Sequence, residues 1–303
     1  MMRTVVAGLD GSPESLSAAD WAAREAESRG LPLRLVHAWE WQPYDYDTRG
    51  SLADADLTRQ WAERIPREAS AALRRRYPGL PITADRIAGR AAPTLLSAAA
   101  EAELLVLGSR GLGTLAGFAF GSVSLAVVAA ATRPVVLLRA GGPAGAGQRP
   151  HEEGEPSKPT GDGAVVLGLD LERPGDAVIA FAFDAAARRS VPLRVVHSWS
   201  PPAIYGYAPV EVPADLGLDL AANVAQTLAQ RLLPWREKFP DVRVTTDIRL
   251  GGTAPLLIEA SSGASLLVVG RRTRGSALGS HIGPLTHAAL HHSSAPVAVV
   301  PHA

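Results

Sequence analysis

The chain of 303 residues contains no cysteine, only two lysines, and few aromatic residues, which make up 5% of the sequence. The absence of cysteine excludes disulfides, thiolate catalysis, and zinc or iron–sulfur centres held by thiolates. The 30 basic residues are balanced by 30 acidic ones, so the formal net charge is zero. Without a basic excess, we expect no nucleic-acid-binding surface.

The sequence also lacks a clear targeting or membrane-spanning segment. Its first residues, MMRTVVAGLDGS, contain a short apolar run that Asp10 interrupts, unlike a signal peptide. The longest apolar stretch, residues 115–131, is broken by glycines and serines. We expect a buried loop and helix there rather than a membrane span. The prediction is a cytoplasmic protein that does not bind membranes.

The sequence contains an internal repeat of one unit. TVVAGLD (residues 4–10) and LPLRLVHAW (31–39) recur 160 positions later as AVVLGLD and VPLRVVHSW. ELLVLGSR (103–110) recurs 162 positions later as SLLVVGRR. The duplication predicts two domains, residues 1–140 and 164–303. Residues 141–163, rich in glycine, proline and charge, predict a flexible linker.

Within each copy, apolar strand patterns alternate with helical ones. In the first copy we expect five strands, and a helix that starts at Pro13 with Ser12 as its N-cap. Its apolar residues Leu16, Ala19, Ala22 and Ala23 stand at helical spacing. A second helix is expected over residues 52–76. This alternation predicts an α/β fold, with a five-stranded parallel sheet in each domain and helices on both of its faces. Ligands of such sheets bind beyond the carboxyl ends of the strands.

A glycine-rich stretch, GSRGLGTLAGFAFGSVS (residues 108–124), follows the fourth predicted strand. It is not a Walker P-loop, because neither lysine of the chain lies near it. A GxGxxA match at residues 111–116 follows the wrong strand for a dinucleotide fingerprint and lacks the acidic residue that should come later. The wider spacing G-x2-G-x9-G-S instead describes a loop that leaves a strand and returns to open a helix. The N–H groups at that helix start predict an anion site.

This spacing resembles that of the universal stress protein family, in its tandem two-domain, ATP-binding form. The Asp that ends the first strand, the His near the end of the second and the final Pro-Val strand agree with the family as well. The resemblance implies a Rossmann-like domain of the adenine nucleotide α-hydrolase type. It also implies ATP, with Mg²⁺, as the cofactor. We predict no catalytic residue and no metal ligand from the protein, because the sequence shows no evident general base beside the loop and no paired carboxylates for magnesium. Carried over residue by residue, the resemblance assigns the nucleotide to Asp10, Ala38, Gly108, Arg110, Gly111, Gly121, Ser122, Val123 and Ser124.

The second copy departs from this pattern. Gly111 becomes Thr273, and Ser122 becomes Pro284, which has neither an N–H group nor a hydroxyl. Gly11-Ser12 becomes Leu171-Glu172. We therefore expect ATP to bind mainly in domain 1, with a degenerate motif in domain 2.

Other polar and aromatic residues have two interpretations each. Asp10 either binds the nucleoside or caps the first helix, and His37 and His197 are expected to be packed and hydrogen-bonded rather than general bases. His287 and His291 have a spacing that can ligate a metal, although a solvated helix face is the favoured interpretation. Trp39, Trp41 and Trp199 are expected in core or interface packing rather than stacked on adenine.

The function that agrees with these expectations is an ATP-binding regulatory protein in a stress response, with an unidentified protein partner. A slow ATPase or a nucleotidyl-transferring enzyme on the same fold is the alternative, and a structural protein without ligand is a third. In the family, the last strand mediates dimers. We accordingly expect the fifth strands of the two copies to pair as an intramolecular pseudo-dimer, with a homodimer as a further option.

Overall fold

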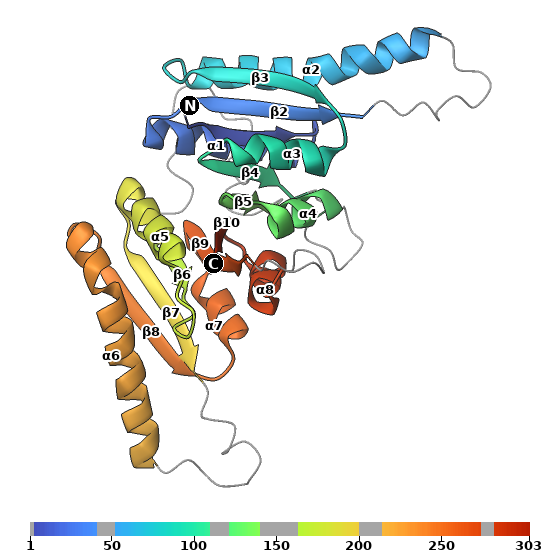
Figure 1. The fold of residues 1–303 in the computed structure, drawn as a ribbon. Helices are drawn as coiled ribbons and strands as arrows, with labels where there is room; N and C mark the ends of the chain where they lie inside the picture. The colour runs from blue at the N-terminus through green and yellow to red at the C-terminus, as the bar shows by residue number, and fades with distance from the viewer. Residues whose placement is uncertain (1–2, 41–51, 110–120, 140–162, 200–213, 274–281) are drawn as a thin grey trace. The chain divides into compact units, whose positions relative to one another are not determined.

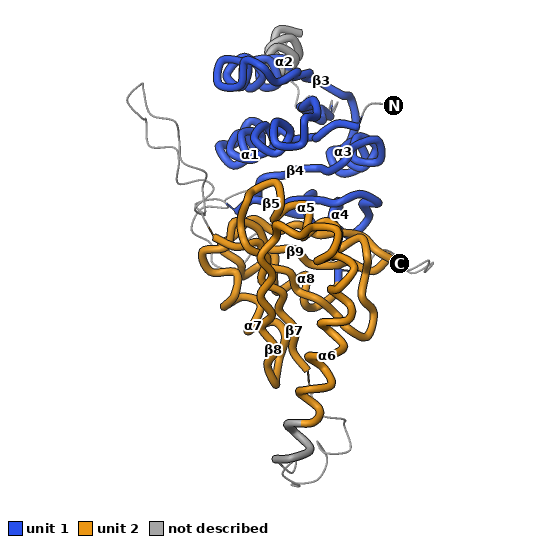
Figure 2. The backbone as a smooth tube through the Cα atoms, turned by 90° about the vertical axis from the view of Figure 1, so that its left-hand side faces the viewer, with its two compact units in different colours: residues 1–160, 274–282 blue, residues 161–273, 283–303 orange. Residues whose placement is uncertain are grey.

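The computed structural model describes residues 3–40, 52–109, 121–139, 163–199, 214–273 and 282–303. The chain separates into two compact units, coloured differently in Figure 2. The first unit contains β1–β5 and α1–α4, and the second contains β6–β10 and α5–α8. Each unit is therefore one copy of the sequence repeat.

In the first unit, strands and helices alternate along the chain (Figure 1). Its elements are β1 (Val5–Leu9), α1 (Pro13–Arg29), β2 (Leu33–Trp39), α2 (Leu52–Arg76), β3 (Ile82–Ala88), α3 (Ala91–Ala100), β4 (Leu104–Gly108), α4 (Ser122–Ala130) and β5 (Val135–Leu138).

The second unit repeats this order. Its elements are β6 (Val165–Gly168), α5 (Asp176–Arg189), β7 (Leu193–Trp199), α6 (Ala214–Lys238), β8 (Val244–Leu250), α7 (Thr253–Ala260), β9 (Leu266–Arg272), α8 (Pro284–His292) and β10 (Val297–His302).

Each unit holds a parallel sheet. The strand order is β3-β2-β1-β4-β5 in the first unit and β10-β9-β6-β7-β8 in the second. Helices α1 and α2 pack on one face of the first sheet, and α3 and α4 pack on the other (Figure 1). The chain reverses its winding direction between β1 and β4, so this switch point is the place where a ligand is expected. The predicted α/β class with parallel five-stranded sheets is confirmed.

The start and the N-cap of α1 lie where the sequence predicted them, but one residue expected on its apolar face is exposed. Helix α1 starts at Pro13, Ser12 caps it by accepting a hydrogen bond from the Ser15 N–H, and Gly30 ends it with φ of 63°. Ala19 and Ala22 are buried, but Leu16 is 39% exposed. The prediction for Leu16 is wrong, because this residue lies in the first turn of α1, where its side chain stays partly in solvent. Among the described residues, no helix is long and apolar enough to cross a membrane.

Candidate functional site

The carboxyl edge of the first sheet brings together several of the predicted nucleotide-binding residues. Asp10 follows β1, Ala38 lies in β2 and Gly108 ends β4, and these three strands are neighbours in the sheet. The register pairs Leu9 with His37 and Ala7 with Val106, which places the three strand ends at one level. Gly121, Ser122, Val123 and Ser124 form the start of α4. Arg110 and Gly111 lie outside the described residues.

Asp10 organises the turn between β1 and α1. Its Oδ1 accepts hydrogen bonds from the Ser12 N–H, at 3.0 Å, and from the Ser12 hydroxyl, at 2.5 Å. Between them, Gly11 adopts φ of +84°, a conformation that L-residues rarely adopt. Ser12, not Asp10, is the residue that caps α1. The Asp10 carboxylate supports that cap while its residue stays exposed at the switch point.

The start of α4 carries helix donors that no described side chain caps. Gly121 is the N-cap residue, none of the described side chains caps the helix, and its first turn has no acidic residue. Leu125 donates to the Gly121 carbonyl, so the N–H groups of residues 122–124 have no partner within the helix. Ser122 and Val123 are exposed, whereas Ser124 is buried. Orphan donors and the helix dipole together favour an anion there.

Gly108 and Gly121 of the motif differ in whether the surrounding structure requires a glycine. A Cβ at Gly108 would lie 2.5 Å from the Glu14 carbonyl oxygen and 2.9 Å from the Ser15 nitrogen, so the first turn of α1 requires glycine there. A Cβ at Gly121 would meet no atom of the described residues within 4 Å, and its φ is −71°. Neither packing nor backbone conformation within the described parts of the unit explains Gly121.

The second unit differs at each of these points. Helix α8 starts at Pro284, which lacks an N–H group, and the Thr286 hydroxyl donates to the Gly270 carbonyl. Helix α5 starts at Asp176, three positions later than α1 does in the aligned repeat, and no side chain in the described ranges caps it. Asp170 keeps one turn contact, because its Oδ1 accepts from the Glu172 N–H at 3.0 Å.

His302, the last residue of β10, replaces the missing first turn of α5. A Cβ at Gly175 would lie 2.6 Å from His302 Cγ, and a Cβ at Gly270 would lie 2.8 Å from His302 Nε2. The His302 carbonyl accepts hydrogen bonds from the Thr273 N–H, at 2.7 Å, and the Thr273 hydroxyl, at 2.9 Å. The imidazole thus fills the space that the α1 backbone fills beside Gly108. The sequence analysis missed His302 because it belongs to no motif and matches no residue of the repeat pattern.

The remaining candidates are mostly structural. The imidazoles of His37 and His197 donate from Nδ1 to the carbonyls of Leu9 and Leu169, at 2.8 and 2.9 Å, because a carbonyl can only accept. The predicted hydrogen-bonded role of these histidines is confirmed. Trp39 is covered by the Arg86 guanidinium, 5.2 Å from the ring centroid, and Trp41 lies outside the described residues.

His287 and His291 lie side by side on α8. Their rings are tilted by 33° to each other, with centroids 4.2 Å apart. Across the described parts of the chain, no three histidine or acidic side chains cluster in a way that could hold a metal ion.

Comparison with known proteins gives consistent matches along the chain. The sequence model of the universal stress protein family matches residues 1–139 and 163–301. Universal stress protein Rv2005c of Mycobacterium tuberculosis is 34% identical over 306 residues, which cover 97% of this chain and 96% of that protein. Universal stress protein Rv1996 of the same organism is 31% identical over 320 residues, covering 97% and 94%. The crystal structure of a universal stress protein from Archaeoglobus fulgidus covers 99% of this chain and 98% of its own, with a TM-score of 0.66 and 16% identity.

Proposed function

The chain belongs to the universal stress protein family, and from that premise we propose that it is a regulatory protein that binds an adenine nucleotide, ATP, in its first unit. The observation that carries this proposal is the start of α4. There, three N–H groups without a partner in the helix lie behind Gly121, a glycine that the described residues do not otherwise explain.

The proposal assigns binding residues to the nucleoside, the ribose and the phosphates of ATP. Asp10 and Ala38 contact the nucleoside, because they lie at neighbouring strand ends. Gly108, Arg110, Gly111 and Gly121 lie along the ribose and phosphates, with Ser122, Val123 and Ser124 donating their N–H groups to the phosphates. Mg²⁺ would be carried by phosphate oxygens, since the described residues offer no ligand cluster for it.

The proposal includes an asymmetry between the units. Pro284 removes one donor from the second helix start, and Leu171-Glu172 replaces the Gly11-Ser12 turn with bulk and negative charge. We propose that the second unit binds nucleotide weakly or not at all, and that nucleotide in the first unit changes the binding of a partner protein. Hydrolysis, if present, is slow.

Two further proposals concern the assembly and its setting. The fifth strand of each unit lies at an edge of its own sheet, which leaves it suited to strand pairing. We propose that these strands pair within one chain, and that the protein acts in the cytoplasm.

The decisive experiment is mass spectrometry of the ligand released from freshly purified protein, followed by calorimetric titration with ATP. The expected result is one tight site per chain. A purified protein that carries no nucleotide and binds none would overturn the proposal. A phosphate-release assay separates regulation from catalysis, because fast turnover would favour the enzyme.

A further inference from the structure

A pair formed by an arginine and an aspartate joins the second and third strands of both units. In the first unit, Arg34 Nε donates to Asp85 Oδ2 at 2.7 Å, from β2 to β3. In the second unit, Arg194 donates from its terminal nitrogen Nη2 to Asp247 Oδ2, from β7 to β8. The residues occupy matching positions of the repeat, so the two units offer a direct comparison of what lies around the pair.

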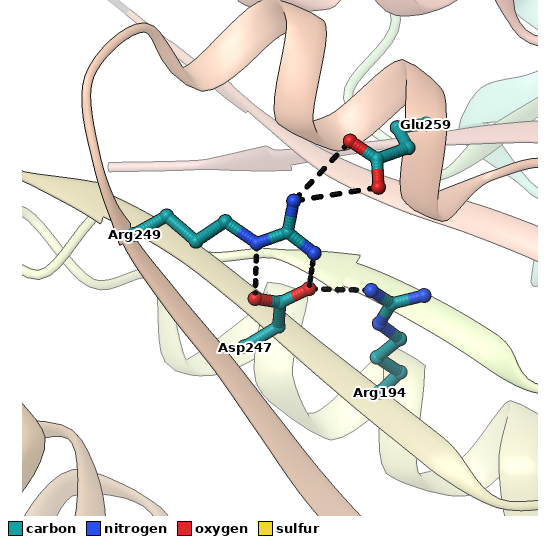
Figure 3. Close-up of polar contacts among 4 residues, drawn as sticks. All are labelled: Arg194, Asp247, Arg249 and Glu259. Atoms are coloured by element: carbon teal, nitrogen blue, oxygen red, sulfur yellow. Dashed lines mark hydrogen bonds and ion pairs between the residues drawn. The ribbon is translucent and has the colours of Figure 1, made fainter.

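In the second unit, another arginine completes a four-residue network (Figure 3). Arg249 donates to both oxygens of Asp247, at 2.9 and 3.1 Å, and to both oxygens of Glu259 on α7, at 3.3 and 3.2 Å. Burial would raise the pKa of Asp247, but the hydrogen bonds and charges of the two arginines outweigh it and lower that pKa. A single carboxylate thus accepts two guanidinium groups at once.

In the first unit, the positions of Arg249 and Glu259 are taken by Ile87 and Ser97, and the space is open. A groove of about 440 Å³ lies between β3 and α3. It is lined by Arg34, Ile87, Pro93, Thr94, Ser97 and Glu101, among others. Thr94 replaces Leu256, which is buried in the second unit and adds bulk there.

The charges around the groove do not balance. The network of the second unit contains two arginines and two carboxylates. In the first unit, Arg34 faces two carboxylates, Asp85 at 2.7 Å and Glu101 at 3.8 Å, which leaves one excess negative charge. The next residue of β3, Arg86, does not supply the missing cation, because it is engaged with Trp39 and Glu63.

We propose that this groove binds the arginine side chain of a partner polypeptide, in the place that Arg249 occupies in the second unit. The guanidinium hydrogen-bonds to Asp85 Oδ1, which accepts no hydrogen bond from the described residues, and lies within reach of Glu101. The methylene groups of the arginine pack on Ile87 and Pro93. The planar, permanently charged guanidinium suits this site better than an ammonium, because it can contact one carboxylate bidentately. This site is separate from the proposed nucleotide site.

The test uses the full chain with its isoleucine methyl groups labelled for NMR, and argininamide as the probe. We expect argininamide to shift the Ile87 methyl signal, and citrullinamide, its uncharged isostere, to bind at least about tenfold more weakly, because its ureido group lacks the positive charge and has a carbonyl oxygen in place of one guanidinium nitrogen donor. Equal binding of the two, or no shift with argininamide, would overturn the proposal.

Variants locate the site. The double substitution Ile87→Arg with Ser97→Glu installs the network of the second unit and should abolish argininamide binding, which is followed by calorimetry because this variant lacks the Ile87 methyl reporter. Asp85→Asn should weaken the response at least about fivefold, because an amide cannot replace the carboxylate charge. As a matched control, Arg249→Ile in the second unit should leave it unchanged. Binding that persists in the double variant would show that argininamide binds elsewhere and would refute the assignment.

Discussion

The backbone of Glu14 lies directly against Gly108: a Cβ at position 108 would sit 2.5 Å from the Glu14 carbonyl oxygen. The first glycine of the motif is thus required by the packing of α1 on β4, whether or not a ligand is present. Gly121 is different, because a side chain there would meet no described atom within 4 Å. One motif therefore combines a glycine needed for folding with a glycine that we attribute to binding.

Substituting Gly108 with alanine should destabilise the first unit. The new methyl group would collide with backbone that cannot move aside without shifting α1, which typically costs about 1–3 kcal/mol. The free energy of unfolding, measured by urea denaturation without nucleotide, is expected to fall by that amount. An unchanged midpoint would show that α1 can shift freely.

Substituting Gly121 with leucine should abolish ATP binding and leave stability almost unchanged, because the added Cβ meets no described atom within 4 Å and the φ of −71° is ordinary. Gly283→Leu is the matched control, since it stands at the same position of the second unit, where a Cβ would also meet no described atom. Calorimetry should show lost binding only for the first variant. Equal losses for both would indicate two functional sites and refute the asymmetry.

Ser122→Pro should convert the first helix start into that of the second unit. Proline is well accepted at the first position of a helix, so the fold should persist, but the N–H group and the hydroxyl are removed. Loss of a hydrogen bond to a charged phosphate corresponds to about 1.5–3 kcal/mol, or roughly a tenfold or greater loss of affinity. Ser122→Ala keeps the N–H group and should lose less. If the two variants bind ATP equally, the backbone donor is not used.

The phenol of Tyr77 should make the stability of the first unit depend on pH in the alkaline range. Burial, together with the charge of Asp20 and a 3.0 Å hydrogen bond from the Tyr77 hydroxyl to Asp20, raises the pKa of Tyr77 to about 12. Because the folded state holds this proton more tightly than the unfolded chain does, the contribution is complete below pH 10.0, the usual value. It is lost as the pH rises towards about 12.

Tyr77→Phe removes this titration and is structurally acceptable, because Phe239 takes the same place in the second unit and packs on Phe183 at 5.7 Å. Unfolding followed by circular dichroism from pH 9 to about 12 should show a smaller loss of stability for the variant than for the native chain. Parallel curves would mean that Tyr77 titrates normally.

Much of the fold could be predicted from the sequence because its signals are local. The boundaries of α2 at residues 52–76, the cap at Ser12 and the stop at Gly30 follow from helix periodicity and from residues with special backbone preferences. The internal repeat predicted two parallel sheets, since each copy must bury the same apolar strands. The exposure of Leu16 was not predictable in this way, because periodicity does not tell which turns of a helix the rest of the fold covers.

Only the tertiary structure showed what each glycine of the motif packs against. Sequence spacing could align Gly108 with Gly270, but only packing shows the α1 backbone beside the first and the His302 imidazole beside the second. Likewise, Ile87 and Ser97 are unremarkable in the sequence, and only their position opposite Arg34 and Glu101 opens a groove. The sequence by itself determined the elements and the family pattern, because these depend on neighbours along the chain. The sites depend on residues that folding brings together from distant parts of each unit.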